Sequence, residues 1–102
     1  MTTTVGFILL YTLAVTSEGE TVMAHSQYDQ IQGEPPKLYA TRDECQQQLQ
    51  NLVFGDDLNS YEVKVVKGGW MYAEKFETRG RGERTSTTTH RVDCFEVRDT
   101  PD

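Results

Sequence analysis

The stretch Tyr39–Gly55, which reads Tyr-Ala-Thr-Arg-Asp-Glu-Cys-Gln-Gln-Gln-Leu-Gln-Asn-Leu-Val-Phe-Gly, carries the clearest helix signal in the chain. Thr41 and Glu44 have the spacing of a capping box, in which the Thr oxygen accepts from the Glu44 amide and the Glu44 carboxylate accepts from the Thr41 amide. Gly55 supplies a stop. The residues between them predict one short amphipathic helix over about residues 42–54, whose apolar side is formed by Cys45, Leu49, Leu52 and Val53.

The segments on both sides of this helix have the patterns of strands. Val5–Val15 is apolar at every second position and partly apolar at the positions between, which predicts a central strand covered on one face and partly covered on the other. Alternation and turn residues mark the other strands. The predicted strands cover residues 5–15, 21–28, 61–65, 70–76 and 91–98, with turns at 17–20 and 67–69 and a connection containing Gly and Pro at 30–37.

The predicted order is therefore strand, strand, helix, strand, strand, strand. This order indicates a single domain of residues 1–102 in the α+β class, with an antiparallel sheet of about five strands and one helix packed on one face. A chain of this length can bury one modest core but not two.

A single helix covers only one face of such a sheet, and Trp70 is its expected packing partner. The apolar side chains of the other face then remain without a covering helix. An exposed apolar patch of this kind marks a protein interface, unless sheet twist or long loops cover it. The residues expected on this face are Ile8, Leu10, Met23, Met71 and Phe95.

The composition is that of a soluble globular domain on the polar side, with 36% hydrophobic and 25% charged residues. Sixteen acidic against ten basic residues give a net charge of -6. This balance argues against a nucleic-acid partner, because phosphate contacts require a basic face. The acidic net charge permits a partner with a basic groove. The alternative is that this charge only keeps the protein soluble.

The apolar run of residues 5–15 is similar to the apolar region of a secretory signal peptide. However, no basic residue precedes it, since the first Lys or Arg is Lys37. The run is too short for a membrane span. We therefore expect a strand there, a cytoplasmic protein and no membrane partner. In that compartment Cys45 and Cys94 are expected to be reduced, buried thiols, and a disulfide is the alternative if the helix packs over the last strand.

The segment from Glu77 to Thr89 is expected to form the final hairpin loop, with both the arginine–glycine stretch and the threonine-rich run inside it. Its arginines can clamp phosphates or an acidic protein patch. No aromatic residue is interleaved with them, which favours a solvated hairpin tip that discourages edge pairing. The arginines concerned are Arg79, Arg81 and Arg84.

No catalytic or metal motif stands out, so we expect neither an enzyme nor a cofactor. His25 and His90 lack an indicated nucleophile or carboxylate partner, and burial on the helix would make the Cys45 thiol inert. Asp56, Asp57 and Asn59 lack the closing Glu of a calcium loop and are expected to form a turn.

The pattern aromatic-x-Thr-x-x-x-Cys at the start of the helix, followed by a Cys in the last strand, resembles that of small uncharacterised bacteriophage and proteobacterial proteins. The residues that carry this resemblance are Tyr39, Thr41, Cys45 and Cys94. Small acidic α+β phage proteins include inhibitors of host enzymes, among them anti-CRISPR proteins. The resemblance implies a viral protein that binds a host protein or protein complex in the cytoplasm of the host cell.

The sequence therefore leads to a non-catalytic binding protein that occludes a site on a host macromolecule. The alternative is a structural or self-assembling protein, such as a homodimer joined through its strand edges. Candidate contact residues are Glu62, Trp70, Tyr72 and Glu74, together with Arg79, Arg81 and Arg84.

Overall fold

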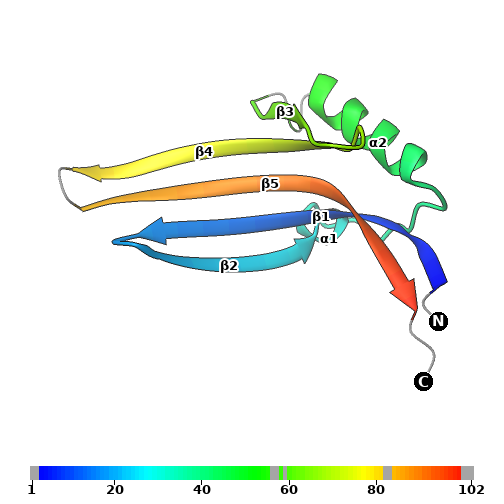
Figure 1. Cartoon of the computed structure of the whole chain (residues 1–102), viewed down its shortest axis with the longest axis horizontal. Coiled ribbons are helices and arrows are strands. Elements are labelled where there is room, and N and C mark those ends of the chain that lie inside the picture. Colours follow the sequence, from blue (N-terminus) through cyan, green and yellow to red (C-terminus); the bar gives the residue numbers. More distant parts are fainter. Residues whose placement is uncertain (1–2, 56–57, 59, 82–83, 100–102) are drawn as a thin grey trace.

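The structure, a computed structural model, describes residues 3–55, 58, 60–81 and 84–99. Five strands form one antiparallel sheet, in the spatial order β2-β1-β5-β4-β3 (Figure 1). The predicted α+β class and the antiparallel five-stranded sheet are confirmed, and a second helix of one turn was not predicted. The elements are β1 (Thr3–Ser17), β2 (Glu20–Gln27), α1 (Tyr28–Ile31), α2 (Arg42–Phe54), β3 (Glu62–Val65), β4 (Met71–Arg81) and β5 (Arg84–Asp99).

Helix α2 begins and ends where the sequence predicted. The Thr41 hydroxyl accepts from the Glu44 amide at 3.2 Å, as in a capping box. The reciprocal bond differs from the prediction, because the Glu44 carboxylate accepts from the Ala40 amide at 3.2 Å and not from Thr41. The capping hydrogen bonds therefore reach back to Ala40, one residue before the Thr41 amide that was expected to donate.

The core lies between α2 and one end of the sheet. The helix contacts β1, β4 and β5, and its Cys45 and Leu49 side chains are buried. Beyond the helix the sheet continues as two long hairpins with no helix above them (Figure 1). The buried residues are Phe7, Leu9, Tyr28, Tyr39, Cys45, Leu49, Leu58, Ala73, Val92 and Cys94.

The segment that leads into α2 crosses β1 closely. Phe7 and Tyr39 exchange two backbone hydrogen bonds of 2.7 Å each, so this segment extends the sheet edge where β2 has ended. A Cβ atom at Gly6 would lie 2.6 Å from the Tyr39 carbonyl oxygen. Glycine at this position therefore permits the crossing.

Strands β4 and β5 are longer than predicted, and the expected loop from Glu77 to Thr89 is wrong. Most of the arginine–glycine stretch and all of the threonine-rich run lie inside these strands, where Arg79 pairs with Ser86. Threonine is β-branched and favours extended backbone, which explains why the run continues the strand. Residues 82–83, the side chains of Arg81 and Arg84, and the predicted turn residues Asp56, Asp57 and Asn59 lie outside the part that the structure describes.

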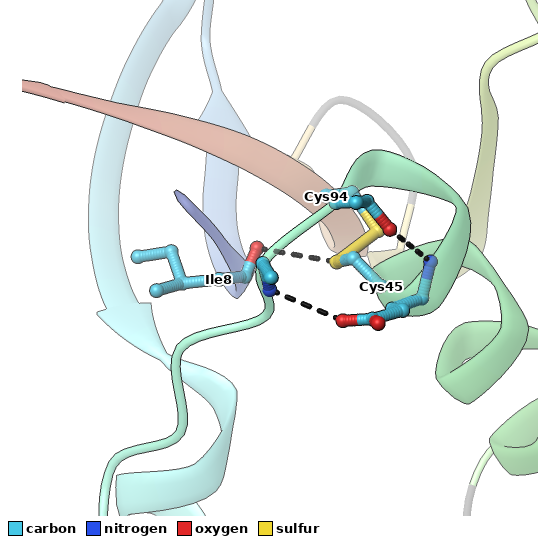
Figure 2. The surroundings of a disulfide bond; sticks show 6 residues. Ile8, Cys45 and Cys94 are labelled. Atoms are coloured by element: carbon cyan, nitrogen blue, oxygen red, sulfur yellow. Dashed lines mark hydrogen bonds between the residues drawn. A yellow bond between two sulfur atoms is a disulfide. The ribbon is translucent and has the colours of Figure 1, made fainter. Parts of the chain in front are cut away.

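A disulfide joins Cys45 of α2 to Cys94 of β5, so the expectation of reduced thiols is wrong (Figure 2). The helix packs directly over β5, which brings the two Cα atoms to 6.0 Å, within the range that a disulfide spans. The Cys45 sulfur also lies 3.7 Å from the Ile8 carbonyl oxygen (Figure 2). This is a close contact only, because a disulfide sulfur has no hydrogen to donate.

Candidate protein-binding face

The side of the sheet that faces away from α2 is called the open face here. Side chains alternate between the two sides of a strand, so the neighbours of the buried positions Leu9, Ala73 and Val92 point to the open face. The pairing register places Leu10, Asp93, Tyr72 and Lys64 in one row across β1, β5, β4 and β3. The next row contains Thr12, Arg91, Glu74 and Glu62.

Six side chains of these two rows form what we call the charged band: Glu62, Lys64, Tyr72, Glu74, Arg91 and Asp93. The Arg91 guanidinium carbon lies 4.0 Å from the centroid of the Tyr72 ring. The Lys64 ammonium lies 3.9 Å from a Glu74 carboxylate oxygen and 5.8 Å from the centroid of the Phe76 ring. Cation–π and ionic contacts between neighbouring strands thus hold Lys64, Tyr72, Glu74 and Arg91 in place.

Asp93 has an unusual environment within the charged band. Burial raises the pKa of its carboxyl group above the ordinary value, and the charges of Arg91 and His25 only partly oppose this effect. Arg91 Nε lies 3.9 Å from one Asp93 carboxylate oxygen. Among the described residues, neither Arg91 Nε nor the other Asp93 oxygen has a hydrogen-bond partner, and both atoms are buried from solvent.

Apolar side chains flank the charged band on the open face. Ile8 pairs with Phe95 on one side of it, and Met23 pairs with Ala14 on the other. The prediction that Ile8, Leu10, Met23 and Phe95 share this face is confirmed by the register. The same prediction for Met71 is wrong.

Met71 shares the side of Ala73, two residues further along β4, and therefore points toward the helix. Its sulfur accepts a contact of 3.6 Å from the Gln50 amide nitrogen of α2. Met71 also lines an apolar cavity of about 210 Å³ beneath the last turns of α2, together with Leu49, Val53, Phe54 and Val63.

The proposed aromatic contact residues do not lie together. Trp70 precedes β4 and packs on the helix side, with its ring centroid 6.0 Å from that of Phe7 and the Arg42 guanidinium 4.4 Å above it. This position confirms Trp70 as a packing partner of the helix. Of the predicted contact residues, the open face brings together only Glu62, Tyr72 and Glu74.

The predicted arginines lie away from the charged band. Arg79 is seven residues beyond Tyr72 on the same strand, which corresponds to roughly 23 Å at the rise of an extended chain. By alternation, Arg79 also shares the side of Ala73. Arg81 and Arg84 form the last described pair of the β4–β5 hairpin, still further from the band. The sequence did not single out Arg91 or Asp93, because their importance depends on the register between β4 and β5.

On the helix side, the structure brings together three polar residues that the sequence did not connect. The Tyr11 hydroxyl and His90 Nδ1 are 2.5 Å apart, and His90 Nε2 lies 3.5 Å from a Glu77 carboxylate oxygen. Hydrogen bonds from Lys75 and His90 lower the pKa of Glu77, while burial raises the pKa of the Tyr11 phenol. This chain of contacts joins β1, β5 and β4 on the helix side.

Within the described part of the chain, no three His, Cys, Asp or Glu side chains are grouped so that they could hold a metal ion. No described helix has the length and apolar character needed to cross a membrane. Comparison with protein-family models, with curated proteins and with solved structures gives no match for this chain.

Proposed function

We propose that this protein is a non-catalytic binding module that uses its open face to occupy a site on another protein. The observation that supports this proposal is the charged band, in which Arg91 pairs with Tyr72 and Lys64 pairs with Glu74 across three strands, beside exposed apolar residues. Tyr and Arg are frequent anchors of protein interfaces. Side chains that are already held in place lose less freedom when a partner binds, which lowers the cost of association.

The proposed partner is a host protein or protein complex with a basic site. The chain carries a net charge of -6, and the charged band contains three carboxylates against two cations. Such a surface is attracted to a basic groove, including one that normally binds nucleic acid. Together with the resemblance to small acidic phage proteins, this chemistry favours an inhibitor that blocks the groove, as an anti-CRISPR protein does.

The experiment compares two arginine variants on immobilised protein exposed to bacterial lysate. Arg91→Ala removes the cation that covers Tyr72, while the control variant Arg79→Ala removes an arginine outside the open face. We expect the wild type and Arg79→Ala to retain a stoichiometric partner and Arg91→Ala to lose it. Failure of the wild type to retain any partner, or equal retention by both variants, would contradict the proposal.

A cytoplasmic location is a separate proposal, and the disulfide between Cys45 and Cys94 is the feature that tests it. Disulfides persist mainly in oxidising compartments, so a cytoplasmic function requires a fold that works with free thiols. Neither cysteine lies on the open face, and both side chains are buried. Retention of the partner by reduced protein would support the cytoplasm, whereas binding by the oxidised form alone would indicate an oxidising compartment.

A further inference from the structure

The two edges of the sheet differ in how well they are protected against pairing with another strand. An edge strand presents unpaired backbone groups, and proteins usually protect it by short length, charged residues, proline or a bulge. Strand β3 has four residues, of which Glu62 and Lys64 are charged. Strand β2 has eight residues, pairs with β1 without a break in register, and contains no Asp, Glu, Lys, Arg or proline from Thr21 to Gln27.

The unprotected strand is also free along its outer side. Every residue from Glu20 to Ser26 is exposed, and the exposed fractions of Val22 and Met23 are 71% and 58%. Figure 1 shows no described element beside the outer side of β2. The chain that follows β2 contacts the end of the strand, where the Gln27 side chain donates to the Lys37 carbonyl at 3.3 Å.

We infer that β2 pairs with β2 of a second copy of this chain, antiparallel about a two-fold axis at Met23. A two-fold axis perpendicular to a sheet keeps each side chain on its own side, so only positions of the same side can lie opposite each other. Any register centred on a residue meets this condition, and Met23 lies near the middle of β2, so an axis there pairs the most residues. It places Met23 opposite its counterpart and Val22 opposite Ala24 of the second copy.

The charges of the strand fit this pairing. The only charged residue of β2, Glu20, then lies opposite Ser26 of the second copy, so no like charges face each other across the new ladder. The two open faces lie on the same side of a continuous ten-stranded sheet, and both α2 helices lie on the other side. The dimer does not depend on whether the open face has a partner.

Salt provides a first test. Each copy carries a net charge of -6, which opposes association at long range, while the pairing strand itself is almost uncharged. Added salt screens the repulsion between the two bodies and leaves the backbone pairing intact. In sedimentation experiments we expect a dimer whose dissociation constant falls as salt rises. A wild type that stays monomeric at every protein and salt concentration would overturn the inference.

Two matched variants locate the interface. Val22→Lys puts a charge on β2, and Val65→Lys puts the same charge on β3 at a residue that is 65% exposed. Both substitutions change the net charge equally, so a difference in dimerisation between the two variants shows which edge strand forms the interface. We expect Val22→Lys to be monomeric and Val65→Lys to remain dimeric. A dimer that survives Val22→Lys, or that is lost in Val65→Lys, would contradict pairing through β2.

Cross-linking then tests the register. Directly opposite Cα atoms in an antiparallel pair are about 4.5–5.5 Å apart, within reach of a disulfide. We expect Met23→Cys to give a disulfide-linked dimer rapidly under mild oxidation, and the control variant Val65→Cys to remain unlinked at the same concentration. Equal rates for the two variants would show random collision and exclude the proposed axis at Met23.

Discussion

The two ends of the sheet follow the same sequence pattern but differ in burial. Leu9 and Leu13 lie on the same side of β1, yet Leu9 is 1% exposed beneath α2 whereas Leu13, beyond the helix, is only half-buried. No described residue of the ranges 11–27 and 74–91 is buried. Alternation therefore predicts which side of a strand is apolar, but not whether anything covers it.

The difference follows from the lengths of the elements. A helix rises about 1.5 Å per residue and a strand about 3.3 Å, so the 13 residues of α2 span roughly 20 Å and the 16 residues of β5 roughly 50 Å. The helix thus covers less than half of the sheet. On the same side of the uncovered end, polar contacts between strands lie beyond the helix, such as Tyr11 with His90 at 2.5 Å and His90 with Glu77 at 3.5 Å.

The largest expected effect is at the disulfide, which joins the helix to the covered end. Replacing both Cys45 and Cys94 by Ala frees the unfolded chain from a closed loop with a sequence separation of 49 residues. The chain-entropy relation gives a loss of about 4 kcal/mol in the free energy of unfolding. Urea denaturation of oxidised wild type and double variant measures it, and a loss below about 1 kcal/mol would show that the covered end does not depend on this bond.

The next effect is at Leu49, the most buried leucine of α2. Leu49→Ala leaves a cavity between the helix and the sheet and should lower the free energy of unfolding by about 3 kcal/mol. Chemical denaturation measures the loss. A cost no greater than that of removing the helix cap would mean that α2 does not close the core.

The loss of the helix cap at Thr41 is expected to cost less free energy of unfolding than the loss of the Leu49 side chain. Thr41→Ala removes the oxygen that accepts from the Glu44 amide and should cost about 1 kcal/mol, since water can partly replace it at an exposed helix end. The same denaturation experiment measures it. Thr41→Ser keeps the oxygen and should stay close to the wild type, and a large loss in that variant would point to packing of the Thr41 methyl group.

The parts that the sequence predicted depend on neighbouring residues, and the parts that it did not predict depend on distant ones. The cap at Thr41, the bounds of α2 and the alternation in β1 are local features and were predicted. The extension of β4 and β5, the side of Met71 and the disulfide require the register between strands. The contact between Arg91 and Tyr72 likewise arises only when β4 and β5 are aligned.

A smaller effect, of opposite sign, is expected on the open face. Because burial raises the pKa of Asp93 above the ordinary value of 3.8, ionisation of this carboxyl group destabilises the fold. The neutral carboxyl group makes its full contribution to stability at pH below 3.8, and this contribution is lost as the pH rises through the raised pKa of the folded state. Asp93→Asn should therefore be more stable than the wild type at neutral pH and equal to it in acid. Denaturation at both pH values measures this, and a less stable variant at neutral pH would show that the pairing of Asp93 with Arg91 outweighs burial.

The most direct test of the difference between the two ends compares two leucines of one strand. Leu9→Ala and Leu13→Ala remove the same atoms from the same side of β1, one beneath α2 and one beyond it. Chemical denaturation should show a loss of about 3 kcal/mol for Leu9→Ala and about 1 kcal/mol or less for Leu13→Ala. Equal losses would mean that the far end is packed as tightly as the core, which would contradict the account of a sheet longer than the helix that covers it.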